Sequence, residues 1–156
     1  MSCLATEEML SCQACSLFQT RQQVVPGHGN PNANLVCIGE APGAEEDKQG
    51  QPFVGPAGRR FDRQLAAAGL RRNEIFVTNT VLCRPPDNNL RAYPDAQLRC
   101  PPLWLFPVLQ QVKPRVVVAL GRTAGALWFP GLDAHAMAEL ARHTGEYVVV
   151  GALHPS

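Results

Sequence analysis

Four short apolar segments recur along the chain, and their pattern predicts the strands of one sheet. The first three are rich in β-branched residues and almost continuously apolar, as strands buried on both faces are. The four segments lie at residues 34–39, 75–79, 115–120 and 146–153. We expect the fourth, 146-EYVVVGAL-153, to be the last strand of the sheet.

The segments between these strands carry apolar residues at helical spacing, which predicts helices there. The helices are expected at residues 57–70, 94–112 and 122–129, with a further short helix at 4–18. Pro101, Pro102 and Pro107 lie inside the second of them. Because each interior proline costs a helix about 3 kcal/mol, that helix should be broken or in two parts. Residues 19–33 are rich in glycine and proline and read as a loop.

Strands that alternate with helices predict an α/β fold: a three-layer αβα arrangement around a mostly parallel, four-stranded sheet. In such sheets, ligands bind beyond the carboxyl ends of the strands. Three segments leave those ends, at residues 40–56, 79–93 and 154–156. We therefore expect the functional residues to lie in these segments.

Length and composition narrow the class of protein further. The chain has 156 residues, of which 46% are hydrophobic, and we expect a single domain spanning residues 1–156. No apolar run approaches the roughly 18 residues of a membrane span, and the N-terminus does not resemble a secretory signal, so a cytoplasmic location is expected. Residues 51–125 hold eleven basic and four acidic side chains. This excess is compatible with a phosphate-binding face, or with arginines scattered over solvated helices.

Cysteines are unusually frequent for a chain expected in the cytosol, where disulfides are rare. Four of them form a C-x-x-C pair and a wider pair, namely Cys12, Cys15, Cys83 and Cys100. Four thiolates from two segments can hold zinc or an iron–sulfur cluster, although a chance or redox pair is also possible. Cys37 lies within a predicted strand and should be a buried apolar residue, while Cys3 should be an incidental thiol.

The loop after the first strand, 39-GEAPGAEEDKQGQPFVG-55, combines four carboxylates with four glycines and has little helical pattern. It lacks the G-x-x-x-x-G-K-[ST] pattern of a nucleotide phosphate loop. Phe53 could offer a stacking face to a planar ligand, or could be a core residue under the loop. Asn79 could present a donor and an acceptor to a ligand, or could cap a turn. His154 could be a hydrogen-bond donor or a solvent-exposed side chain.

Several of these motifs, in this order, resemble those of the family 4 uracil-DNA glycosylases, which are iron–sulfur members of their superfamily. The resemblance runs from about residue 8 to the last residue. Its motifs are 12-CQAC-15, 39-GEAPGAEEDKQGQPFVGPAG-58, 78-TNTVLCRPP-86, Cys100 and 154-HPS-156. It implies an enzyme that removes uracil from double- or single-stranded DNA without cutting the strand, acting as a monomer with no membrane partner. It also implies a structural [4Fe-4S] cluster held by Cys12, Cys15, Cys83 and Cys100.

The resemblance also implies roles for the residues of the pocket. Phe53 would stack on a flipped uracil, and the amide of Asn79 would match its N3–H and O4. Further uracil-binding residues would be Gly39, Ala41 and Glu46, the last in a supporting role.

Two residues would serve the chemistry. Glu40 would position water or stabilise the sugar cation, and His154 would donate a hydrogen bond to uracil O2. The neighbouring carboxylates, Glu45 and Asp47, are expected to be solvated or to cap the turn.

The chain departs from this family at its end. Family members continue past the His-Pro motif into a loop and a long helix, whereas this sequence stops at Ser156. A shortened chain, or weak or absent activity, is therefore expected. The alternatives are a catalytically impaired uracil- or DNA-binding module and an iron–sulfur protein with a redox or sensing role. The stretch 130–145 shows no clear hairpin pattern, and its His135 and His143 should lie on the surface.

Overall fold

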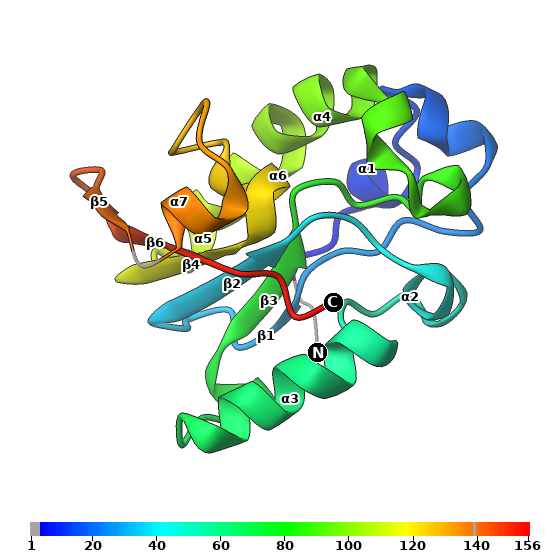
Figure 1. Ribbon diagram of the computed structural model, residues 1–156. Helices are drawn as coiled ribbons and strands as arrows, with labels where there is room; N and C mark the ends of the chain where they lie inside the picture. Colours follow the sequence, from blue (N-terminus) through cyan, green and yellow to red (C-terminus); the bar gives the residue numbers. More distant parts are fainter. Residues whose placement is uncertain (1–3, 139) are drawn as a thin grey trace.

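In the computed structural model, which describes residues 4–138 and 140–156, six strands form one sheet (Figure 1). The strand order is β1-β3-β2-β4-β6-β5. The strands are β1 (His28–Gly29), β2 (Leu35–Gly39), β3 (Phe76–Asn79), β4 (Val116–Leu120), β5 (Ala141–His143) and β6 (Val148–Ala152). The four central strands pair in parallel, as predicted, so their carboxyl ends share one edge of the sheet.

The sheet is larger than the predicted four strands, because an antiparallel strand is added at each edge. β1 has only two residues and lies within the stretch predicted as loop. β5 pairs with β6 to form a hairpin in the stretch that showed no hairpin pattern, and all three of its residues are exposed. Neither strand alternates buried and exposed side chains, and that alternation is the pattern by which an edge strand is predicted from sequence. His135 and His143 are exposed, as expected.

The helices are shorter than predicted but lie in the expected places, with two additions among the described residues. They are α1 (Glu7–Leu10), α2 (Ala44–Gln49), α3 (Pro56–Ala67), α4 (Pro94–Cys100), α5 (Phe106–Val112), α6 (Gly121–Gly125) and α7 (Ala134–Met137). Four 3₁₀ turns accompany them: η1 (Ser16–Gln19), η2 (Arg72–Glu74), η3 (Pro86–Asn88) and η4 (Leu90–Ala92). The predicted helix at 4–18 is α1 and η1 with the C-x-x-C pair between them. Neither α2 nor α7 was predicted.

The helices cover both faces of the sheet, which gives the predicted three layers (Figure 1). Phe61 and Leu65 of α3 pack with Cys37 and Val77 on one face. On the other face α5 packs against alternate strand residues, among them Ile38. Cys37 is buried within β2, as predicted, whereas Cys3 lies outside the described residues. None of the described helices is long and apolar enough to cross a membrane.

The proline-rich helix is interrupted, as predicted, but by a wider turn. A π-helical turn, η5 (Pro101–Leu105), joins α4 to α5, and right-handed helical dihedral angles persist on both sides of it. Prolines lack the N–H that an α-helical bond needs, so a π turn accommodates them at less cost than a break in the helix would. The turn begins directly after Cys100, so it also sets the position of that thiol.

Candidate active site and cysteine centre

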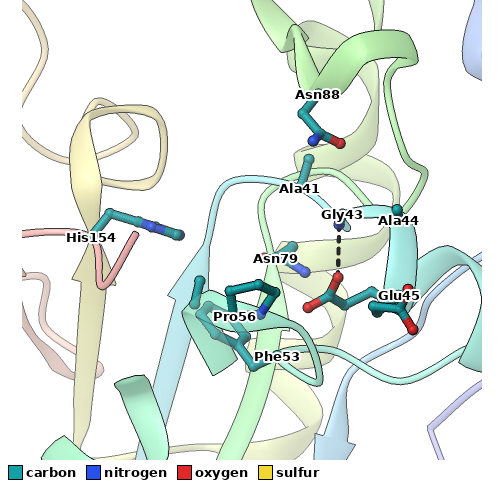
Figure 2. A pocket seen from close by; sticks show the side chains of 11 residues that line it. Ala41, Gly43, Ala44, Glu45, Phe53, Pro56, Asn79, Asn88 and His154 are labelled. Carbon is teal, nitrogen blue, oxygen red and sulfur yellow. Dashed lines mark hydrogen bonds between the residues drawn. The ribbon is translucent and has the colours of Figure 1, made fainter. Parts of the chain in front are cut away.

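A cavity of about 300 Å³ lies beyond the carboxyl ends of the parallel strands (Figure 2). Gly39 and Asn79 are the last residues of β2 and β3 and pair in register, and His154 follows β6. The lining residues are Ala41, Gly43, Ala44, Glu45, Glu46, Phe53, Pro56, Ala57, Asn79, Asn88 and His154. The structure therefore brings together five of the seven residues predicted for catalysis and uracil binding.

A buried ring and a buried amide meet in this cavity. Asn79 is 3% exposed and Phe53 is 5% exposed. The Phe53 ring centroid lies 5.0 Å from that of Phe61 and 6.0 Å from that of His154. Gly39 does not line the cavity but makes room for it: an added Cβ would lie 2.5 Å from Phe53 Cζ and 2.6 Å from Asn79 Oδ1. Its missing side chain is what lets the ring and the amide converge.

Glu46 holds the two loops that border the cavity. It is 8% exposed, and its carboxylate accepts hydrogen bonds from the N–H groups of Gly43 (3.1 Å), Val54 (3.1 Å) and Gly55 (2.9 Å). The first of these bonds is drawn in Figure 2. Both glycines leave space for the carboxylate, because a Cβ at Gly43 would lie 2.9 Å from Glu46 Oε2 and one at Gly55 3.2 Å from Oε1. Glu46 thus positions the Phe53 loop.

His154 points into the cavity from the segment after β6 (Figure 2). Its Nδ1 accepts a hydrogen bond from the N–H of Ser156 at 3.2 Å, so the proton of the neutral imidazole resides on Nε2. Burial lowers the pKa of His154 from its ordinary value of 6.5, and the nearby carboxylate of Glu40 partly opposes this shift. At pH 7 the side chain is therefore a neutral donor through Nε2–H.

Glu40 lies beside this cavity and not in it. It lines a second cavity of about 260 Å³, which shares Ala41 and His154 with the first and is also bordered by Arg122. The arrangement sets a carboxylate next to the imidazole, on the rim of the pocket that Phe53 and Asn79 form. Gly39 and Glu40 are thus the two predicted site residues that do not line the first cavity.

The four cysteines of the predicted metal site surround one cavity on the α4 side of the sheet. Cys12 and Cys15 reach it from the N-terminal segment, Cys83 from the loop after β3, and Cys100 from the end of α4. Arg21 Nη1 donates to Cys83 Sγ at 3.4 Å, and Trp104 Nε1 donates to Cys12 Sγ at 3.3 Å. Burial raises the pKa values of the Cys15 and Cys83 thiols, and that of Cys100 to about 12.

A family model described as the uracil DNA glycosylase superfamily matches residues 26–156. The chain belongs to this superfamily. It is 43% identical over 126 residues to a type-4 uracil-DNA glycosylase of Archaeoglobus fulgidus, covering 81% of this chain and 62% of that protein. It is 41% identical over 128 residues to a type-4 enzyme of Thermotoga maritima, covering 82% and 66%. A type-5 uracil-DNA glycosylase of Thermus thermophilus is 31% identical over 147 residues, covering 83% and 65%.

The chain thus spans about three fifths of the length of the curated type-4 relatives it matches. The superfamily match contains the parallel sheet and every lining residue of the first cavity, because it begins at residue 26 and runs to the last residue. The C-x-x-C pair precedes the matched segment. Of the four cysteines, the superfamily match therefore covers only Cys83 and Cys100.

Polar donors accompany the four thiols. Zinc and an iron–sulfur cluster both accept four thiolates. Hydrogen bonds to the sulfurs, such as those that Arg21 and Trp104 donate here, are a usual feature of iron–sulfur sites. Among the residues that the structure describes, no three His, Cys, Asp or Glu side chains lie close enough together to hold a single metal ion.

The carboxylates next to Glu46 differ in environment, and the expectation for one of them is wrong. The side chain of Glu45 is 46% exposed and pairs with Lys48 at 3.4 Å, as expected of a solvated side chain. Asp47 is only 2% exposed and accepts the N–H groups of Gln22 (3.0 Å) and Gln23 (3.4 Å). It is buried because these backbone donors of the N-terminal segment need an acceptor there. The acidic run is the first turn of α2, where the interaction of carboxylates with the helix dipole also stabilises the helix.

Sequence reasoning missed Asn88 as a lining residue. It lies in η3, has φ of +55°, and its Oδ1 accepts a hydrogen bond from Arg84 Nε at 3.1 Å. Asparagine tolerates positive φ better than most residues, so the run 87-DNN-89 after two prolines carried a turn signal. That signal does not say which of the three side chains reaches the cavity.

Proposed function

We propose that this chain is a uracil-DNA glycosylase that hydrolyses the N-glycosidic bond of deoxyuridine in DNA and leaves an abasic site. The observation that carries the proposal is the meeting of a buried ring, a buried amide and a neutral imidazole in one cavity. The superfamily match supports the same reaction class. The names of the type-4 relatives support uracil as the base.

The cavity lined by Phe53 and Asn79, called the base cavity from here on, suits a flipped pyrimidine. Its volume of about 300 Å³ lies at the lower end of the range for small-ligand pockets. Phe53 supplies a face for stacking, which offsets the cost of taking the base out of the duplex. The Asn79 side-chain oxygen accepts from uracil N3–H and its NH₂ group donates to O4. Cytosine carries the reverse pattern at these two atoms, so the same amide rejects it.

The chemistry breaks the bond between C1′ of the sugar and N1 of the base. The bonding electron pair leaves with uracil, and negative charge develops at O2, where His154 Nε2–H donates a hydrogen bond. A donor placed at a developing oxyanion contributes about 2.7–4 kcal/mol to lowering the barrier. Water adds to C1′ and its proton is released, while uracil takes up a proton. Glu40, beside His154 and outside the base cavity, is placed to orient that water or to stabilise the sugar cation.

DNA would approach along a row of adjoining cavities. The second cavity shares Glu40 and Arg122 with a third of about 470 Å³, which Arg91 and Thr123 also line. Arginine contacts to phosphates supply sequence-independent affinity for a nucleic-acid strand. The base cavity is therefore continuous with an arginine-bordered surface suited to the strand that carries the uracil.

The cofactor we propose is a structural [4Fe-4S] cluster held by Cys12, Cys15, Cys83 and Cys100. When bound, it would cross-link the N-terminal segment to the connection between β3 and α4. Arg21 and Trp104 would stabilise the thiolates of Cys83 and Cys12 through the hydrogen bonds they already make. Neither residue touches the base cavity, and the proposed bond cleavage needs no metal.

The test compares duplexes that contain uracil, thymine or cytosine opposite guanine. Iron-loaded protein is incubated with each end-labelled duplex, and abasic sites are revealed by alkaline cleavage. We expect cleavage at uracil alone, and a loss of activity of at least about a hundredfold in Asn79→Ala, because the buried polar edge of the base then lacks its partner. Tight binding of the uracil duplex without any release would instead identify a binding module.

A further inference from the structure

The residue that forms the stacking face has an unusual backbone conformation. Phe53 has φ of +55°, in the left-handed region that L-residues other than asparagine and aspartate seldom adopt. It lies in the short turn 52–55, between α2 and α3, and its ring is buried against Phe61. Such a conformation persists only where the surroundings hold it in place. The contacts around the turn show what holds it.

Arg72 holds the carbonyl side of this turn. The residue lies in η2, between α3 and β3, and its Nη1 donates to the carbonyl oxygen of Pro52 at 3.2 Å while Nη2 donates to that of Phe53. Its Nε donates to Asp62, and its Cζ lies 5.2 Å from the centroid of the Phe61 ring. Two guanidinium nitrogens therefore bind the Phe53 turn, while the third pairs with Asp62 and one face of the group lies over Phe61.

Glu46 holds the opposite side of the same turn, through the N–H groups of Val54 and Gly55. The carbonyl groups of Pro52 and Phe53 are thus bound by a cation, and the N–H groups of the next two residues are bound by an anion. Each charge meets the end of the backbone dipoles that attracts it, so both contacts are charge-assisted hydrogen bonds, which are stronger than neutral ones. The left-handed Phe53 lies between the two.

We propose that Arg72 is a positioning residue of the base pocket, which fixes the Phe53 turn in the conformation that presents the ring to the base. This inference rests on the proposed function, in which Phe53 stacks on uracil. The geometry requires arginine at this position: lysine would keep the charge but has no forked pair of donors to bind two successive carbonyl oxygens.

The test uses two variants and two matched controls in the iron-loaded protein. Arg72→Lys removes the fork and Arg72→Gln removes the charge as well. Asp62→Asn leaves both carbonyl contacts of Arg72 in place, and Arg63→Gln removes an exposed arginine of α3 that is not one of the two residues binding the Phe53 turn. The dissociation constant for free uracil is measured by calorimetry. Amide hydrogen exchange is measured at Val54 and Gly55, and KM and kcat are measured on uracil-containing DNA.

We expect Arg72→Lys to weaken uracil binding about tenfold, because the binding-competent turn becomes a minor conformer. Exchange at Val54 and Gly55 should rise by a similar factor. KM should rise more than kcat falls, since stacking acts on bound substrate and transition state alike. Arg72→Gln should be affected at least as strongly, and both controls should stay within about twofold of the unaltered protein.

Unchanged exchange in both Arg72 variants would overturn the inference, and so would faster exchange with unchanged uracil affinity. The hydrogen-exchange measurement does not depend on catalysis. If the unaltered chain released no uracil, that result would count against the proposed function, while exchange at Val54 would still decide whether Arg72 holds the turn.

Discussion

At the ends of β2 and β3, the pocket depends on a glycine, which has no side chain to fill it. Gly39 lies behind both Phe53 and Asn79, and a methyl group there would come within 2.6 Å of each of them. The same holds on a smaller scale at Gly43, where a side chain would press on the carboxylate of Glu46. Small residues therefore shape this site as much as the polar side chains do.

Gly39→Ala should weaken free-uracil binding by roughly 5- to 150-fold, since overpacking of a rigid site costs about 1–3 kcal/mol. Calorimetry with uracil measures this. Gly69→Ala is the matched control: this glycine has φ of +73° but no neighbour within 4 Å of an added Cβ, so only stability should fall. Equal losses of uracil affinity in both variants would show that strain in the fold, and not the shape of the pocket, was responsible.

The protonation of His154 provides a second test at the scale of one residue. Because burial lowers its pKa below 6.5, the neutral donor form predominates at pH 7 and is lost only as the pH falls through that lower value. The carboxylate of Glu40 raises the pKa, so Glu40→Gln should move the titration midpoint further down. An NMR titration of the His154 ring measures both midpoints. A midpoint above 6.5, or an upward shift in Glu40→Gln, would contradict this electrostatic account.

The sequence predicts which residues gather beyond the strand ends better than it predicts what surrounds each of them. Phe53, Asn79 and His154 could be placed near one another because each follows a predicted parallel strand or lies in a loop that does. Asp47 could not be distinguished from Glu45 in this way, because its partners are backbone N–H groups of Gln22 and Gln23, distant in sequence. Arg72 likewise gave no signal, since it acts on carbonyl groups that every residue has.

Among the elements, α2 contacts both the N-terminal segment and the turn that carries Phe53. This helix of six residues carries Glu46, which holds the Phe53 turn, and Asp47, which holds the N-terminal segment. The side chain of Gln23 returns the contact by donating to the carbonyl oxygens of Asp47 and Lys48. One short helix thus joins the segment of the first two cysteines to the base cavity.

Asp47→Asn should lower the free energy of unfolding by about 1.5–3 kcal/mol, the usual contribution of hydrogen bonds to a buried charged group. Urea unfolding measures the loss. The matched control, Glu45→Gln on the same helix, removes only an exposed ion pair and should change stability by less than about 1 kcal/mol. Similar losses in the two variants would mean that the link between α2 and the N-terminal segment contributes little.

The central elements could be predicted and the peripheral ones could not, for one physical reason. β2, β3 and β4 bury most of their residues, so their apolar runs are visible in the sequence. The edge strand β5 has none buried, and α2 is a short, acidic helix whose stability comes from its contacts. The prolines in the long helix signalled an interruption, but only the structure shows that η5 spans it as a π turn.

At the scale of the whole molecule, the two centres lie in different parts of the fold. The base cavity lies beyond the carboxyl ends of the strands, while the cysteine centre lies between the N-terminal segment, the loop after β3 and α4. Residues 79–83 reach both, because Asn79 lines the first cavity and Cys83 the second. This five-residue segment, like α2, gives the cysteine centre a direct structural connection to the pocket.

Cys100→Ser should remove iron and the visible absorption of the cluster, and should lower the unfolding temperature, since metal-binding energy contributes to folding. Cys37→Ser is the matched control, because Cys37 is also buried, within β2, but does not border the cysteine cavity. Iron content and absorption should be unchanged in that variant. Full iron content in Cys100→Ser would remove this thiol from the proposed ligand set.

Single-turnover release of free uracil is the measurement that tests the central claim most directly. Iron-loaded protein in excess is mixed with a U·G duplex, and uracil is quantified by mass spectrometry for the unaltered chain and for His154→Ala. The account expects one uracil per duplex, an unbroken abasic strand, and a rate about 10²–10³-fold lower in the variant. No uracil from folded, iron-loaded protein, or equal rates in the two proteins, would contradict it.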